Sequence, residues 1–207
     1  MKTGFRRLLV AGLWTLGLVA GSGTPVAAQS ATAGAPPAYL PADAQFMTDM
    51  IAHHAQAVLI AGWAPTHGAS ATIRTLAERI VAGQADEIVL MQRWLADYKE
   101  PVPEGTAHYM AGHDMTGMDH GSMPGMLSQA QLEQLDAARG PEFDRLFLTF
   151  MIQHHEGAIV MVNVLFGQGA GEEERSFRFA SDVYADQTTE IDRMQKMLAA
   201  LPAAGSQ

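Results

Sequence analysis

The sequence contains no cysteine in its 207 residues. This absence excludes a disulfide framework, a lipid anchor of the lipoprotein type, and a cysteine nucleophile. It also removes the thiolate from the possible metal ligands, so a soft metal ion would have to use methionine sulfur.

Basic residues are scarce, with 13 Lys and Arg against 22 Asp and Glu. Three of the basic residues lie in positions 1–28, so the rest of the chain carries ten basic and 22 acidic residues, a net charge of −12 with histidine neutral. A nucleic-acid-binding protein needs a basic face to meet phosphates. The composition therefore argues against nucleic acid and favours cations as partners.

Long hydrophobic runs are also lacking. The longest, Leu8 to Ala20, is interrupted by glycines and is shorter than the roughly 20 apolar residues that a membrane-spanning helix needs. It follows three basic residues and precedes the small residues Val26 to Ala28. This order predicts a cleavable export signal over 1–28, a periplasmic or secreted protein, and no stable membrane span after processing.

Hydrolase and nucleotide-binding motifs are missing: the chain has no G-x-S-x-G and no Walker-type loop. Neither a nucleophilic hydrolase nor a phosphate-binding enzyme is supported. We therefore expect a protein that is not an enzyme.

Helical periodicity and capping residues dominate what is present. A Gly/Ala/Pro-rich leader, 29–42, precedes a predicted helical domain, 43–201, and a short tail, 202–207. The predicted helices run from an N-cap at Asp43 to before Pro65, from a cap at Ser70 to before Pro101, from the capping box Ser128–Gln131 to Gly140, from Pro141 to about Phe166, and from about Glu173 to Leu201. Residues 102–127 have no helical period and are expected to form an irregular connection.

The long helices form two copies of one pattern. MIAHHAQA at 50–57 returns as MIQHHEGA at 151–158, and the helix that follows each copy carries a matching Gln and Glu. Two similar αα-hairpins, each with one apolar face, bury those faces best against each other. The predicted fold is all-α, a ferritin-like four-helix bundle made of two repeated hairpins with an irregular Met/His-rich crossover.

Polar side chains recur on the apolar faces of these helices. His53 and His154 fall in the middle of their apolar stripes, with His54 and His155 beside them, and Met50 and Met151 lie one turn earlier. On the partner helices the polar positions inside the stripe are Gln84, Glu87, Gln187 and Glu190. A buried glutamate is costly unless it is paired or bound to a cation. These residues therefore form either a structural hydrogen-bond network or a metal site in which the glutamates are ligands or orient the imidazoles.

The connecting segment is unusually rich in methionine and histidine. Its candidate ligands are His108, Met110, His113, Met115, Met118, His120, Met123 and Met126. The stretch is too glycine-rich to bury these methionines, so packing does not explain them. Thioethers with imidazoles suit copper, as Cu(I) more than Cu(II).

The sequence resembles a bacterial family known as domain of unknown function 305, whose members carry one or two Met-Ile-x-His-His motifs. FDRLFLTFMIQHHEGAIVM, residues 143–161, is close to that pattern. The resemblance implies a ferritin-like bundle that binds copper through Met and His in an exported protein. The positions that it carries over are Met50, His53, His54, Met151, His154, His155 and Met161, and the first repeat departs from it because Ile60 stands where the second has Met161.

The resulting hypothesis is an exported copper-binding protein for copper sequestration, resistance or transfer to another exported copper protein. One alternative is a ferritin-like di-metal oxidase using Glu87 and Glu190, although such sites use Glu-x-x-His and no glutamate lies three residues before these histidines. The other is a structural bundle whose buried His/Glu network fixes helix register.

Overall fold

A computed structural model describes residues 39–103 and 123–202, and helices joined by short turns make up these ranges. The helices are α1 (Pro41–Ala61), α2 (Ala71–Asp97), α4 (Gln129–Ala137), α5 (Pro141–Gly167) and α6 (Glu174–Ala200). The described ranges contain no strand, so the predicted all-α class is confirmed. They also contain no helix that is long and apolar enough to cross a membrane.

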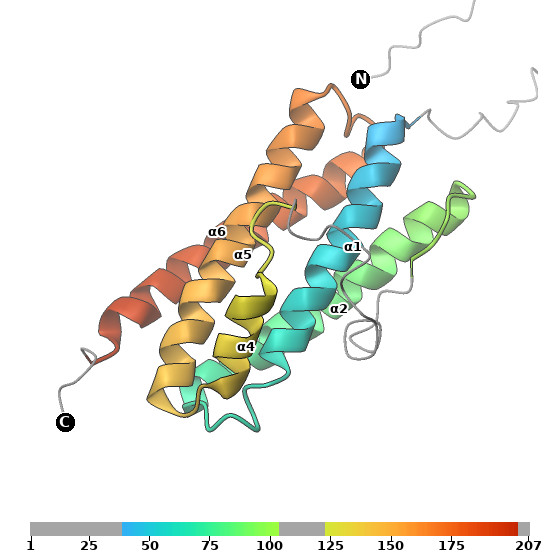
Figure 1. Ribbon diagram of the computed structural model, residues 1–207. Helices are drawn as coiled ribbons and strands as arrows, with labels where there is room; N and C mark the ends of the chain where they lie inside the picture. Colours follow the sequence, from blue (N-terminus) through green and yellow to red (C-terminus); the bar gives the residue numbers. More distant parts are fainter. Residues whose placement is uncertain (1–38, 104–122, 203–207) are drawn as a thin grey trace, which may run out of the picture. The chain divides into compact units, whose positions relative to one another are not determined.

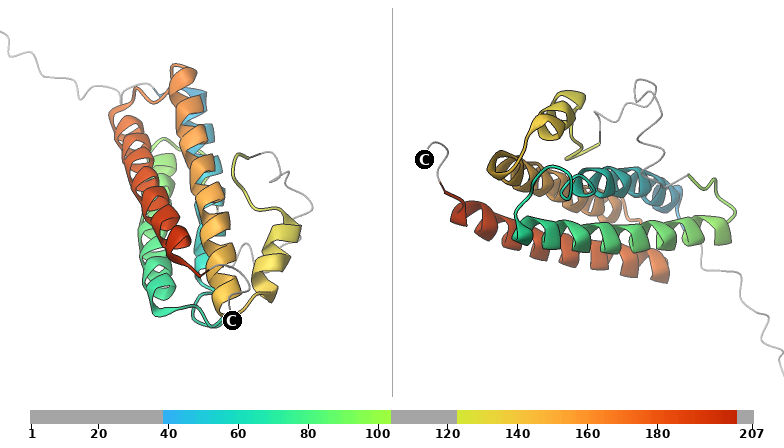
Figure 2. Two further views of the ribbon diagram at one scale, coloured as in Figure 1. Left: turned by 90° about the vertical axis from the view of Figure 1, so that its left-hand side faces the viewer. Right: turned by 90° about the horizontal axis from the view of Figure 1, so that it is seen from below.

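The two predicted hairpins are α1–α2 and α5–α6, each packed along its length, and α1 also packs on α5. Figure 1 and the two views of Figure 2 show α1 beside α5 in one layer, with α2 and α6 behind them in a second layer. The short α4 lies on the outer face of the α1/α5 layer. The likeness to ferritin in particular stays a prediction.

Most helix ends lie where the sequence predicts them. The Ser70 hydroxyl accepts a hydrogen bond from the Ile73 amide, and Ser128 and Gln131 form the expected capping box. Pro141 opens α5, as its fixed backbone angle favours. Three helices end earlier than predicted: α1 stops at Ala61, α2 at Asp97 and α4 at Ala137, each three residues before the predicted end.

The predicted N-cap Asp43 is wrong, because α1 begins at Pro41 with Asp43 inside its first turn. One carboxylate oxygen of Asp43 accepts from the Leu40 amide, and the other accepts from the Gly171 amide and the Ser176 hydroxyl. Asp43 is buried and joins α1 to α6. A capping pattern read from sequence cannot show such long-range contacts.

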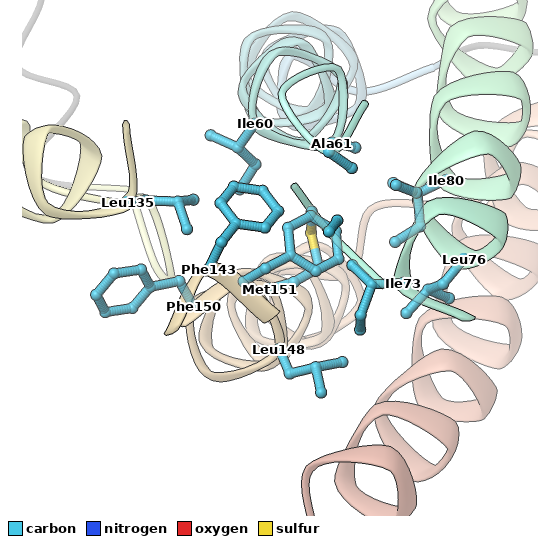
Figure 3. Packing of buried hydrophobic residues seen from close by; sticks show 14 of the residues in the cluster. Ile60, Ala61, Ile73, Leu76, Ile80, Leu135, Phe143, Leu148, Phe150 and Met151 are labelled. Atoms are coloured by element: carbon cyan, nitrogen blue, oxygen red, sulfur yellow. The ribbon is translucent and has the colours of Figure 1, made fainter. Parts of the chain in front are cut away.

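The apolar core is divided into two clusters. One joins the end of α1, the starts of α2 and α5, and α4; Figure 3 shows Leu135 of α4 beside Phe143 and Ile60. The other joins the start of α1, the end of α2, the end of α5 and the start of α6. The first cluster holds the end of α1 and the start of α5, and the second holds the start of α1 and the end of α5. These two helices therefore run antiparallel. The sequence positions between the two clusters carry the histidines.

Candidate metal centre

Four histidines form a buried layer between the two apolar clusters. His53, His54, His154 and His155 each have no exposed surface. The rings of His53 and His154 are in contact, with centroids 3.8 Å apart, and the His54 and His155 rings lie 6.4 and 6.3 Å from their sequence neighbours. The prediction that the central pair faces the interior is confirmed, and the flanking pair is just as deeply buried.

Each of the four rings has at least one nitrogen without a hydrogen-bond partner. The Nε2 atoms of His54 and His155 donate to Glu87 and Glu190, each at 2.7 Å, and Nε2 of His53 donates to the Pro124 carbonyl at 3.1 Å. A neutral imidazole that donates from Nε2 has its lone pair on Nδ1. All four Nδ1 atoms are buried without a hydrogen-bond partner, as is Nε2 of His154. An orienting bond on one nitrogen and a free lone pair on the other is typical of metal-binding histidine.

Burial keeps the central imidazoles neutral. Loss of hydration lowers the pKa of His53 to about 3, with a further contribution from His54. The same loss of hydration lowers the pKa of His154 well below its usual value, helped by the charge that His53 would carry. Neutral imidazole is the form that binds metal, so the cluster is ready for a cation at neutral pH.

The thioethers lie at two depths. Met50 and Met151 are fully buried one turn before His53 and His154, whereas Met161 keeps 8% of its surface exposed. Met47, Met91 and Met194 are also buried, as is usual for methionine that fills a core. Six of the predicted ligands, His108, Met110, His113, Met115, Met118 and His120, lie outside the described residues.

The end of the crossover covers the histidine layer, and we call residues 123–127 the strap. The Leu127 amide donates to Oε1 of Gln56 at 2.8 Å, and Nε2 of Gln56 donates to the Leu127 carbonyl at 3.2 Å. Met126 is buried, at 8% exposure. The expectation that the whole segment leaves its methionines exposed is therefore wrong for Met126, because Gln56 and α5 fix the chain against the helices.

A cavity of about 290 Å³ opens beside the strap, at the edge between α1 and α5. Met123 of the strap and Met161 of α5 both line it, together with Asp49 of α1. The cavity therefore offers two thioethers, the kind of soft ligand that suits Cu(I). Ile60, the first repeat's counterpart of Met161, is fully buried in the core instead.

The polar residues of α2 and α6 divide into two kinds. Gln84 and Gln187 are buried, as their place in the apolar stripe predicts. The side chains of Glu87 and Glu190 are 18% and 27% exposed, so the prediction that they lie in the core is only partly right. Each glutamate reaches inward to a flanking histidine and outward to solvent, which limits its desolvation cost.

Sequence reasoning missed the residues that hold the strap. Gln56 and Gly157 occupy the same position in the two repeats and differ because they contact different parts of the strap. A Cβ on Gly157 would lie 2.1 Å from the Pro124 carbonyl oxygen, so only glycine allows this approach. This position is one of three that differ between the two eight-residue repeats, and that difference was the available signal, but only the fold shows its partner.

Gly157→Ala should displace the strap. We expect the free energy of unfolding to fall by about 1–3 kcal/mol, because the clash is with backbone that cannot rotate away. Amide hydrogen exchange at Leu127 should become faster. The matched control is Gly83→Ala in α2, where an added Cβ meets nothing within 4 Å and stability should rise by about 0.5–1 kcal/mol. Equal effects of the two substitutions on Leu127 exchange would contradict the proposed contact.

The arrangement is incomplete as a three-ligand site. Among the described residues, no three His, Asp or Glu side chains are grouped closely enough to hold a metal ion. The candidate ligands that remain are the paired His53 and His154 rings and the thioethers described above. Such a set suits a soft ion that accepts few ligands, such as Cu(I), rather than one that needs an octahedral oxygen shell.

Several solved structures share this fold. A Deinococcus radiodurans DUF305 fragment matches with a TM-score of 0.66 and 29% identity over 80% of this chain and all of its own. A DUF305 protein of Streptomyces coelicolor, described as secreted, matches with a TM-score of 0.64 and 29% identity, covering 76% of this chain and 92% of its own.

A third match is CopM in its Cu(II)-bound form, with a TM-score of 0.60 and 28% identity over 76% of this chain and 95% of that one. CopM also has Cu(I)-bound and Ag-bound structures. No curated protein matches the chain. The family model for domain of unknown function DUF305 matches residues 43–198, which include both histidine pairs and the strap, and the chain therefore belongs to the DUF305 family.

Proposed function

We propose that this chain is an exported copper-binding protein that holds Cu(I) with its buried imidazoles and neighbouring thioethers. The observation that carries the proposal is the set of unpartnered nitrogens in the histidine layer. A buried polar atom without a partner costs about 1–3 kcal/mol. Four imidazoles arranged this way are costly as structure and become favourable when a metal ion accepts their lone pairs.

The chemistry of the donors favours Cu(I) among the common metal ions. Imidazole alone would also suit zinc or iron, but methionine sulfur is a soft ligand that selects Cu(I). Met123 and Met161 share a cavity beside the layer, and Met50 and Met151 lie one helical turn before its central histidines, in the adjoining apolar clusters. The structural likeness to CopM, which has been solved with copper and silver bound, supports the same assignment.

The proposed role is sequestration, resistance or transfer of copper outside the cytoplasm. In this scheme the Met/His-rich residues 107–126 capture ions, and the histidine layer holds them. Another exported copper protein is the proposed acceptor. We propose in addition that residues 1–28 are an export signal. We also propose that the protein binds copper without catalysing a reaction.

Two alternatives make different predictions. A di-metal oxidase would need Glu87 and Glu190 as metal ligands, whereas each accepts a hydrogen bond from a histidine in the structure. A purely structural layer needs its polar atoms satisfied, and Gln84 and His154 are not. Two bridged iron ions in purified protein would favour the oxidase, and absence of copper binding at the layer would favour the structural role.

A competition titration with a Cu(I) chelator tests the proposal. It compares the mature chain, a variant with the six His and Met residues of 108–120 replaced by serine, and His53→Ala/His154→Ala. We expect each variant to lose a different class of bound copper, because the two sets of ligands are separate. Met197→Leu is a control, since this thioether is packed against the core away from the layer. If the double substitution leaves all copper binding intact, the proposed layer site is wrong.

A further inference from the structure

A groove lies on the other side of the histidine layer, between α2 and α6. It has a volume of about 240 Å³ and is lined by Gln84 and Glu87 of α2 and by Asp186, Gln187 and Glu190 of α6, together with nearby arginines. We call these five residues the amide–carboxylate groove. None of the thioethers discussed above lines it, so its donors are oxygen and nitrogen.

The amides of the groove lack partners. Gln84 is 3% exposed and has no hydrogen bond at either amide atom, and Gln187 is 2% exposed with an unpartnered Oε1. Buried amide groups are normally satisfied, and an exception calls for a ligand or water at that point. Two such amides from equivalent positions of the two repeats line one groove, which indicates that something bound between the helices completes them.

The carboxylates supply the charge that identifies this ligand. Glu87 and Glu190 each use Oε2 to accept from a histidine, and both side chains line the groove and are partly exposed. Burial raises the pKa of Asp186, and the negative charges of Glu87, Glu190 and Asp182 raise it further, so Asp186 is repelled by both glutamates of the groove. A cation between them removes this repulsion.

We propose that the amide–carboxylate groove binds a hard divalent cation, of the Ca²⁺, Mg²⁺ or Mn²⁺ type. Carboxylate and amide oxygens are the ligands that such ions prefer, and these ions retain water in their coordination shell. These water molecules can bridge between the ion and carboxylates that lie too far apart to coordinate it directly. The site adjoins the proposed copper site, because Glu87 and Glu190 also accept hydrogen bonds from His54 and His155, but the proposal does not rest on copper binding.

Arg79 and Arg193 also line the groove and reduce its negative charge without cancelling it. Both are exposed, and neither forms a hydrogen bond or ion pair with the described residues. Their long side chains can extend into solvent when a cation enters. The expected affinity is therefore modest, in the range of about 0.1–1 mM that extracellular calcium sites reach.

Electron paramagnetic resonance of added Mn²⁺ tests the site in the copper-free mature chain, because the signal of free Mn²⁺ is lost on binding. We expect binding to weaken by about tenfold or more in Asp186→Asn and in Gln187→Leu, which remove one charge or one amide from the groove. The matched control is Asp192→Asn, an exposed carboxylate of α6 that pairs with Lys196, and its change should stay below about twofold. Added Ca²⁺ or Mg²⁺ should release the bound Mn²⁺.

Absence of Mn²⁺ binding to the wild type, or equal affinity in Asp186→Asn and Asp192→Asn, would overturn the proposal. Binding that survives Asp186→Asn and Gln187→Leu unchanged would belong to other carboxylates and would overturn it equally. Circular dichroism checks that each variant is folded. Cu(I) titration of Asp186→Asn separates the two sites, since the groove can fail while copper binding stays as in the wild type.

Discussion

His154→Leu should make the copper-free protein more stable while it weakens Cu(I) binding. Both nitrogens of His154 are buried without a hydrogen-bond partner, and the ring lies between two apolar clusters. Leucine has similar size and no polar atom to desolvate. We expect the free energy of unfolding to rise by about 1–3 kcal/mol. Chemical denaturation of the copper-free protein and Cu(I) competition measure the two opposite effects.

His67 provides the matched control, because it is a buried histidine with partners on both nitrogens. Its Nε2 lies 3.0 Å from the Asp136 carbonyl oxygen, and its Nδ1 lies 3.0 Å from the Thr66 hydroxyl oxygen. His67→Leu should lower stability by about 1–3 kcal/mol and leave copper binding unchanged. A loss of stability in His154→Leu similar to that in His67→Leu would mean that the histidine layer is a structural network.

Acid should destabilise the copper-free protein steeply, and this loss of stability should begin at pH values well above those at which carboxylates titrate. The pKa of His53 is about 3 in the folded chain and about 6.5 when unfolded. Its folded pKa is lowered, so the unfolded state binds the proton first and stability falls as pH drops below about 6.5. The pKa of His154 is lowered in the same direction. We expect a loss of about 1.4 kcal/mol per pH unit for each of these histidines between about pH 6 and pH 5.

Denaturant unfolding at several pH values between 7 and 5 measures this slope. The reference is His53→Leu/His154→Leu, which removes both groups and should unfold with a much smaller pH dependence over this range. Copper should protect the wild type against mild acid, because bound metal competes with protons for the same nitrogens. Equal slopes in the wild type and the double variant would show that these histidines are not held neutral by burial.

The helices and their repeat were predictable because their signals are local. Ser70, Pro141 and the Ser128–Gln131 box are features of a few adjacent residues, and the spacing of the two His-His pairs is visible in the printed sequence. The burial of His53 and His154 follows from helical periodicity. These features place the four histidines on the buried faces of the helices without any knowledge of the tertiary structure.

The rest depends on contacts between distant residues. Asp43 resembles a helix cap in the sequence but joins α1 to α6. Met126 belongs to a glycine-rich stretch but is buried, because Gln56 forms hydrogen bonds with the backbone of the next residue, Leu127. The pairing of glutamates with His54 and His155, rather than with the central pair, depends on how α2 and α6 are rotated. Helical periodicity gives the face of one helix and not its register against another.

X-ray absorption at the copper edge tests the central claim most directly. The sample is the Cu(I)-loaded variant in which His108, Met110, His113, Met115, Met118 and His120 are serine, so that only the layer and its neighbouring thioethers can bind. The account predicts scattering from imidazole together with sulfur, and loss of the imidazole component in the same protein carrying His53→Ala/His154→Ala. A spectrum that is unchanged by those two substitutions would contradict copper binding by the histidine layer.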